Sequence, residues 1–153
     1  MNEQIKIDLL REEYFHLQKV VEDFDSKAIS IKAWSITGSL AAMVAGFVKE
    51  DTVRPELFLI ASIASLFFWI VEGHWKTFQL AYYGRIEEIE TWFRKGDMEI
   101  ANLQIDMSWS ARWKIERNKL FQILRWPHVA LPHAIIFIGG VVLFLLYSFK
   151  DLI

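Results

Sequence analysis

The chain contains no cysteine, and only three prolines and seven glycines are spread over its 153 residues. Without cysteine it can form no disulfide, no thiolate nucleophile and no thiolate-bound metal site, and the redox state of its compartment is left open. The sequence also has no glycine-rich phosphate loop, no histidine and glutamate at metal-ligand spacing, and no recognisable nucleophile motif. We therefore expect neither an enzyme nor a cofactor, and we assign no catalytic and no metal-binding residue.

Charge is almost missing from three long stretches, residues 28–48, 57–71 and 129–149, although charged residues are frequent between them. An α-helix needs roughly 20 apolar residues to cross about 30 Å of hydrocarbon. The first and third stretches reach that length, and the second reaches it with its flanking residues. A buried helix of a soluble protein is not apolar around its full circumference for so many turns. We predict an all-α integral membrane protein with transmembrane helices at 28–48, 55–73 and 129–149.

The distribution of lysine and arginine predicts the orientation of these helices, because cytoplasmic loops retain positive charge. Five of these residues lie in residues 1–32 and nine in 74–128, against two in 49–56 and one in the tail. We expect the N-terminus and residues 74–128 to be cytoplasmic. Three crossings then place the C-terminus outside.

The cytoplasmic N-terminal region, residues 1–27, is predicted to be a helix with a heptad seam. Its apolar residues recur at alternating spacings of three and four, which places them on one stripe: Ile7, Leu10, Tyr14, Leu17, Val21 and Phe24. The same spacing continues into the first span through the small residues Ser35, Gly38, Ala42 and Ala45. Small residues allow close approach of helices in lipid. The seam packs either against the protein's own second and third helices or against other copies of the chain.

Residues 74–128 are predicted to be a cytoplasmic helical region. The second span continues as one long helix to a stop at Gly96 and Asp97, and a short helix capped by Asp97 follows within residues 98–107. An amphipathic helix over residues 108–125 carries a net charge of +4. The third span then begins at residue 129, with Pro132 in its first turn, where a missing N–H is tolerated.

The basic helix over residues 108–125 is the clearest candidate for a binding surface. One interpretation is that it lies on anionic lipid headgroups, with its tryptophans at the interface. The other is an anion site for a nucleotide or short single-stranded nucleic acid, in which arginines pair with phosphates and a tryptophan stacks on a base. The candidate ligand-binding residues are Trp109, Arg112, Trp113, Lys114 and Arg117.

Glu72 is the one acidic group predicted at membrane depth, at the inner end of the second span. Such residues are unfavourable in lipid unless they face water or a partner. Glu72 either marks the cytoplasmic interface or attracts cations at the mouth of a pore. The four histidines are scattered and are interpreted as interfacial or packing residues.

A leading cytoplasmic helix (residues 3–24), a two-span hairpin with small residues at 35–39 and 61–65, and a trailing cytoplasmic helix resemble the SLATT and related small transmembrane effectors of bacterial antiphage systems. The resemblance covers about residues 3–95. It implies a pore-forming effector of the bacterial inner membrane, controlled by a nucleotide-derived signal from a nucleotidyltransferase encoded nearby, which disrupts the membrane potential. The third span departs from the two-span pattern and leaves the pore-lining helix undecided. The resemblance identifies no ligand residue.

Two functions are thus considered. The first is a homo-oligomeric helical bundle that forms a ligand-gated channel, with the seam through Ser35, Gly38, Ala42 and Ala45 near the conduction axis and Glu72 at its mouth. The second is a non-conducting membrane adaptor that binds a cytoplasmic partner through residues 7–24 and 78–93. A transporter ranks below both, because the sequence shows no internal repeat and predicts no buried charged relay.

Overall fold

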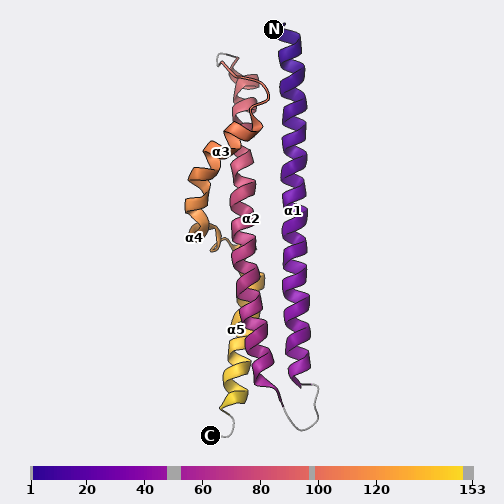
Figure 1. Ribbon diagram of the computed structural model, residues 1–153, viewed down its shortest axis with the longest axis vertical. Helices are drawn as coiled ribbons and strands as arrows, with labels where there is room; N and C mark the ends of the chain where they lie inside the picture. Colours follow the sequence, from indigo (N-terminus) through magenta and orange to yellow (C-terminus); the bar gives the residue numbers. More distant parts are fainter. Residues whose placement is uncertain (1, 48–52, 97–98, 150–153) are drawn as a thin grey trace. The chain divides into compact units, whose positions relative to one another are not determined.

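The computed structural model describes residues 2–47, 53–96 and 99–149, and within these ranges the chain is helical, with no strand. Three of the helices, α1, α2 and α5, are long and apolar enough to cross a membrane (Figure 1). This confirms the predicted all-α class and the three apolar helices. The elements are α1 (Glu3–Phe47), α2 (Pro55–Lys95), α3 (Ile105–Glu116), the 3₁₀ turn η1 (Arg117–Lys119), α4 (Leu120–Ile123) and α5 (Pro127–Ser148).

The ends of the second helix follow from two residue types. α2 begins at Pro55, whose fixed φ suits a first helical position and whose missing N–H has no helical partner there. It ends before Gly96, which has a φ of +69° and donates its N–H to the carbonyl of Trp92 at 2.9 Å. Only glycine adopts this left-handed conformation without steric penalty. The predicted stop at Gly96 is therefore confirmed, while Asp97 lies outside the described residues.

The chain divides into two units, which are described separately. The polar unit comprises the described residues of 1–27 and 74–121, and the apolar unit those of 28–73 and 122–153. The helices α1 and α2 each contribute to both units.

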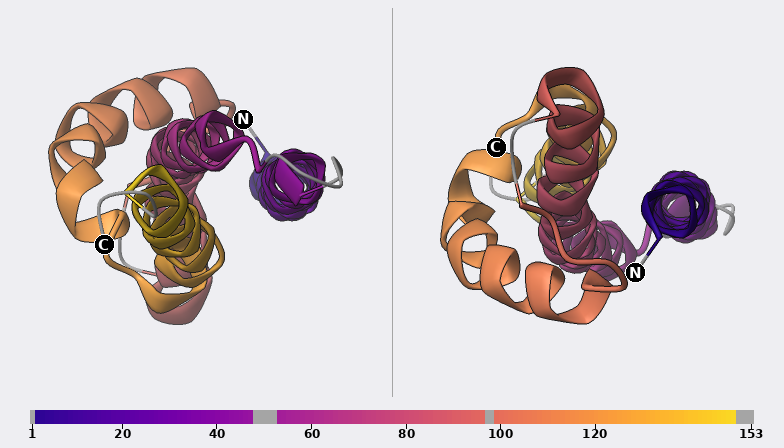
Figure 2. Two further views of the ribbon diagram at one scale, coloured as in Figure 1. Left: turned by 90° about the horizontal axis from the view of Figure 1, so that it is seen from below. Right: turned by 90° about the horizontal axis from the view of Figure 1, so that it is seen from above.

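In the polar unit the N-terminal seam packs against α2. Leu10, Leu17 and Val21 of α1 form a core with Ile86 and Ile89 of α2, and Ile105 at the start of α3 packs against it. Seen end-on in Figure 2, α3 curves around α2. Within this unit, therefore, the heptad stripe serves the packing of a single chain.

Three predicted boundaries need correction. Residues 99–104 are not helical, and the basic helix begins at Ile105 rather than 108, because Ile105 anchors it on the core. It contains the 3₁₀ turn at Arg117–Lys119 and ends at Ile123. The last helix begins at Pro127, so Pro132 lies in its second turn, where its ring removes one helical hydrogen bond.

The apolar unit is built from α1, α2 and α5 around Met43, Phe58, Ala61 and Ile136. Gly140 of α5 lies so close to α2 that an added Cβ would stand 2.8 Å from the carbonyl oxygen of Phe58 and would collide with the hydroxyl of Ser62. Small residues thus bring the helices of one chain together, as expected where lipid supplies no hydrophobic drive for association.

Candidate functional site

The apolar unit contains a network of ionisable side chains from all three helices. The carboxylate of Glu72 on α2 lies 2.6 Å from Nζ of Lys32 on α1 and 2.9 Å from Nε2 of His133 on α5. The side chains of Glu72 and His133 are 1% and 0% exposed, and that of Lys32 is 22% exposed. A carboxylate buried this deeply is stable only when its charge is compensated and its oxygens are hydrogen-bonded. Lys32 and His133 supply both.

Ser35 extends the network along α1, since its Oγ lies 2.9 Å from Nδ1 of His133. With Glu72 ionised, the Nε2–H of His133 donates to it, and the Nδ1 of a neutral ring then accepts the proton of the Ser35 hydroxyl. The imidazole therefore connects a carboxylate on one helix with a hydroxyl on another. A carboxylate, an imidazole and a hydroxyl from three helices thus form one hydrogen-bonded chain.

Buried serines continue the polar contacts away from this network. Ser65 donates to the carbonyl of His133 at 2.9 Å, Ser62 to the carbonyls of Phe58 and Phe137 at 3.0 and 3.2 Å, and Ser39 to that of Ala61 at 3.3 Å. Because each hydroxyl has an acceptor within the chain, none needs water in this conformation. Beyond them the rings of Phe47, Phe58 and Tyr147 pack together, with centroids 4.8–5.9 Å apart.

Sequence reasoning identified Glu72 but missed its partners, and it wrongly expected no buried charged relay. The signal was present in the topology. Lys32 and His133 each stand near the start of an apolar stretch, and Glu72 stands at the end of the one between them. In three consecutive membrane crossings, the starts of the first and third and the end of the second lie at the same face. The three groups could therefore have been predicted to meet.

The residues of the predicted seam in the first span differ in burial. Ser35 is buried in the network, Ala42 is half-buried, and Gly38 and Ala45 are exposed on the surface of the single chain. A Cβ added to Gly38 would meet no described atom within 4 Å. The Gly38–Ala45 side of α1 is thus open to lipid or to another copy.

In the polar unit the structure brings the predicted tryptophans together. Trp109 and Trp113 stack with their rings 5.7 Å apart and 6° from parallel, and both lie against Phe78 of α2. The indole N–H of Trp109 donates to the carbonyl of Phe78 at 3.1 Å. That of Trp113 is buried and finds no acceptor among the described residues. These aromatic faces are largely used for packing α3 on α2.

The predicted basic residues differ in how far they are already paired. Arg112 lies 3.0 Å from Glu116, which also binds Lys119 at 2.9 Å. The guanidinium of Arg117 lies 5.4 Å from the ring centre of Trp113. Lys114 has no ion pair within the described ranges. The charge of this helix is therefore partly neutralised inside the chain.

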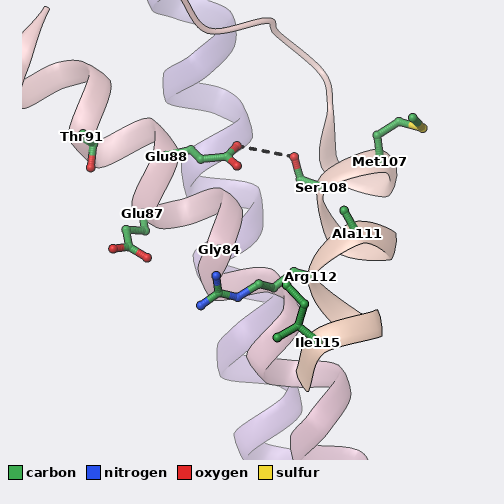
Figure 3. Close-up of a pocket in the computed structure, with 9 residues that line it drawn as sticks. All are labelled: Gly84, Glu87, Glu88, Thr91, Met107, Ser108, Ala111, Arg112 and Ile115. Atoms are coloured by element: carbon green, nitrogen blue, oxygen red, sulfur yellow. Dashed lines mark hydrogen bonds between the residues drawn. The ribbon is translucent and has the colours of Figure 1, made fainter. Parts of the chain in front are cut away.

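A cavity of about 540 Å³ lies beside Arg112, between α2 and α3 (Figure 3). The side chain of Arg112 lies along Gly84, where an added Cβ would stand 3.2 Å from its Cγ, so the helix approach depends on this glycine. Glu88 accepts a long hydrogen bond of 3.5 Å from Ser108 across the cavity. The lining residues are Gly84, Glu87, Glu88, Thr91, Met107, Ser108, Ala111, Arg112 and Ile115.

A second buried ion pair organises the polar unit. Arg85 contacts the two carboxylate oxygens of Glu13 at 2.8 and 3.1 Å and donates to the carbonyl of Ala101 at 2.6 Å, while Glu13 accepts the N–H of Leu103 at 3.0 Å. Burial by itself lowers the pKa of Arg85, but hydrogen bonds to Glu13 and Glu88 outweigh it and raise the pKa above its ordinary value. The pair fastens the segment before α3 to both long helices.

No cluster of three or more metal-ligating side chains occurs among the residues that the structure describes. The sequence matches no protein family, and comparisons with curated proteins and with solved structures found no similar chain. The site itself therefore carries the functional argument.

Proposed function

We propose that the protein is a membrane effector that changes the permeability of the bilayer, and that several copies assemble into the conducting form. The observation that carries this proposal is the network of Lys32, Glu72 and His133 inside the apolar unit. Ionisable residues within membrane helices are unfavourable unless they serve a path for ions or protons or face a partner.

A plain anchor has no use for such a network. Anchoring needs only apolar helices of sufficient length, which α1, α2 and α5 already are. The side chains of Glu72 and His133 instead have to be removed from water, and losing one member of the network leaves its partners unpaired. Their presence is better explained by a membrane unit that rearranges than by one that only holds the protein in place.

The described conformation has the character of a closed state. The buried hydroxyls are all bonded within the chain, and the rings of Phe47, Phe58 and Tyr147 pack beyond them. Glu72 joins α1 to α5 and thereby acts as a latch. Opening would release these groups to line a shared path among several copies, because three helices are too few to enclose one.

We further propose that the polar unit is cytoplasmic and receives an anionic signal, such as a nucleotide. The two long helices contribute to both units, so a change in one unit can be passed along them. The resemblance to antiphage effectors suggests the setting, in which loss of membrane potential arrests an infected bacterium.

A voltage-sensitive dye in bacteria that express the protein tests this proposal. Glu72→Ala removes the latch and should depolarise the cells without any ligand, while the wild type alone leaves the potential intact. Glu56→Ala is the matched control, because Glu56 lies on the same helix with a 53% exposed side chain paired with Arg54. If Glu72→Ala is present in the membrane at wild-type levels and the potential holds, the effector proposal is wrong.

A membrane adaptor is the second candidate, favoured by exposed apolar side chains on the polar unit. Leu103, Met107 and Phe121 are 68%, 70% and 78% exposed, which suits a partner surface if this unit lies in water. An adaptor predicts that Leu103→Ser or Phe121→Ser abolishes capture of one defined cytoplasmic protein, whereas no variant of Glu72 changes the membrane potential.

A further inference from the structure

The polar unit contains a groove whose lining residues all lie outside the basic helix. The groove has a volume of about 420 Å³ and lies between α1 and α2. Small-molecule sites in proteins commonly enclose about 300–1,000 Å³. The lining residues are Arg11, Tyr14, Phe15, Glu90, Phe93 and Arg94.

The two arginines of this groove are not held in close ion pairs by the part of the chain that the structure describes. Arg11 lies with its guanidinium 5.7 Å from the ring centre of Phe15, and neither Arg11 nor Arg94 forms an ion pair within the described ranges. Arg85 and Arg112, by contrast, are each held by a glutamate. The lining therefore includes two arginines, the side chain whose forked donors can pair with a phosphate.

Two aromatic rings stand beside these charges. Phe15 and Phe93, which both line the groove, are 58% and 51% exposed. Exposed rings next to arginines are the combination with which proteins hold planar anionic ligands, because a base stacks on the ring while its phosphate pairs with the guanidinium.

One carboxylate faces the same groove. Glu90 accepts a hydrogen bond of 3.0 Å from the hydroxyl of Tyr14, which ties α2 to α1 at this point. Because its negative charge repels an anion, Glu90 lowers the affinity of the groove for an anionic ligand. The cavity between α2 and α3 is less suitable, since Glu87 and Glu88 both line it and Arg112 is paired with Glu116.

We propose that the groove formed by Arg11, Phe15, Phe93 and Arg94 binds a ring-bearing phosphate anion of the nucleotide class. The inference that the signal acts at this groove rests on the function proposed above. Binding of the anion does not require that the protein conducts ions. A phosphate ester pairs with the two arginines, and the ring lies against a phenylalanine.

Calorimetric titration of the purified full-length protein in detergent tests the site, with ATP as the ring-bearing probe and inorganic pyrophosphate as the ringless one. ATP should bind, and pyrophosphate should bind more weakly. Arg11→Gln and Arg94→Gln should each weaken ATP binding about tenfold, the typical effect of losing a charge-assisted contact. Lys19→Gln, an equal change of charge at an exposed position of α1 outside the groove, should have no effect.

Glu90→Gln gives the opposite prediction, because the amide keeps an acceptor for Tyr14 while removing the opposing charge. Its affinity for ATP should rise. Lack of ATP binding at millimolar concentration overturns the inference, as does binding that is lost in Arg112→Gln and Arg117→Gln but kept in Arg11→Gln and Arg94→Gln. If Arg11→Gln and Arg94→Gln change the mass of the oligomer but not the affinity for ATP, the groove is a contact between copies. That result would also overturn the inference.

Ion flux in vesicles separates this inference from the proposed function. Flux that does not depend on Arg11 or Arg94 contradicts the groove as the signal site but leaves the effector standing. ATP binding that depends on both arginines, without flux under any condition, leaves the groove standing and contradicts the effector.

Discussion

Glu72 joins the three helices of the apolar unit through a single carboxylate. Its two oxygens are divided between Lys32 of α1 and His133 of α5. Removing the carboxylate leaves the buried imidazole of His133 without a hydrogen-bond acceptor and the largely buried ammonium of Lys32 without a counter-charge, whereas removing Lys32 and Glu72 together leaves no unpaired charge. Single and paired substitutions therefore separate the network from ordinary packing.

Glu72→Ala should lower the free energy of unfolding by about 3 kcal/mol, the low end for a broken buried ion pair, because Lys32 can still reach water. The double change Lys32→Met with Glu72→Met should recover a large part of that loss. Unfolding in detergent, followed by circular dichroism, measures both. Equal destabilisation of the single and double variants would show that the charges do not interact.

Two tyrosines predict how the polar unit responds to alkaline pH. Burial raises the pKa of Tyr82 and Tyr83 above the ordinary 10.0, and the charges of Asp106 and Asp25 raise them further. A raised pKa means that the folded state holds the proton more tightly, so its stabilising contribution is complete below pH 10 and is lost as pH rises beyond it. The part of the tyrosinate absorbance that Tyr82→Phe or Tyr83→Phe removes should titrate above pH 10, and Tyr82→Phe should remove part of the alkaline loss of stability.

Helix packing in the apolar unit depends on where glycines face other helices. The adjacent residues Gly139 and Gly140 of α5 show this directly. A Cβ at Gly140 would meet Ser62, Phe58 and Met43, while one at Gly139 would meet nothing within 4 Å in the described chain.

Gly140→Ala should destabilise the protein by about 1–3 kcal/mol through overpacking. Gly139→Ala should be neutral or slightly stabilising, because alanine favours the helix. Thermal unfolding of the two variants side by side measures the difference, and an equal effect of both would contradict the described packing of α5 on α2.

The helices themselves were largely predictable, because their apolar stretches are long and their periodicity is clear. Gly96 marked the end of α2 for a local reason, its left-handed backbone. The predicted start of α3 was three residues too late. The helix begins at Ile105, which packs against the core formed by α1 and α2, and no local sequence pattern predicts that contact. The sequence also could not predict which side of α1 faces the chain's own helices. Gly38 belongs to the predicted seam, but a Cβ added there would meet no described atom within 4 Å.

The candidate sites were only partly predictable from the sequence. The spacing of Arg112 and Glu116 by four residues is typical of an ion pair on a helix, and the structure contains this pair. The contact of Phe78 with Trp109 and Trp113 could not be predicted, because it forms only when α3 folds back onto α2. The groove between Arg11 and Arg94 joins residues more than 80 positions apart and has no local signature.

Assembly of the whole molecule can be tested through the exposed side of α1. The natural chain has no cysteine, so a single introduced cysteine is the only reactive thiol. Ala45→Cys, on the exposed side, should form disulfide-linked dimers in membranes if copies meet there. Ser39→Cys, whose position is buried against Ala61 within the chain, should not. Crosslinking of Ser39→Cys but not Ala45→Cys would contradict the proposed assembly.

The most direct test of the account is ion flux through vesicles that contain only the purified protein. Vesicles loaded with potassium report the permeability of wild type, Glu72→Ala and Glu56→Ala at matched protein content. The account predicts that Glu72→Ala vesicles lose their gradient many times faster than the other two, and that wild-type vesicles lose it only when a nucleotide is added. Equal retention of potassium by all three, with and without ATP, would contradict a membrane unit held shut by Lys32, Glu72 and His133.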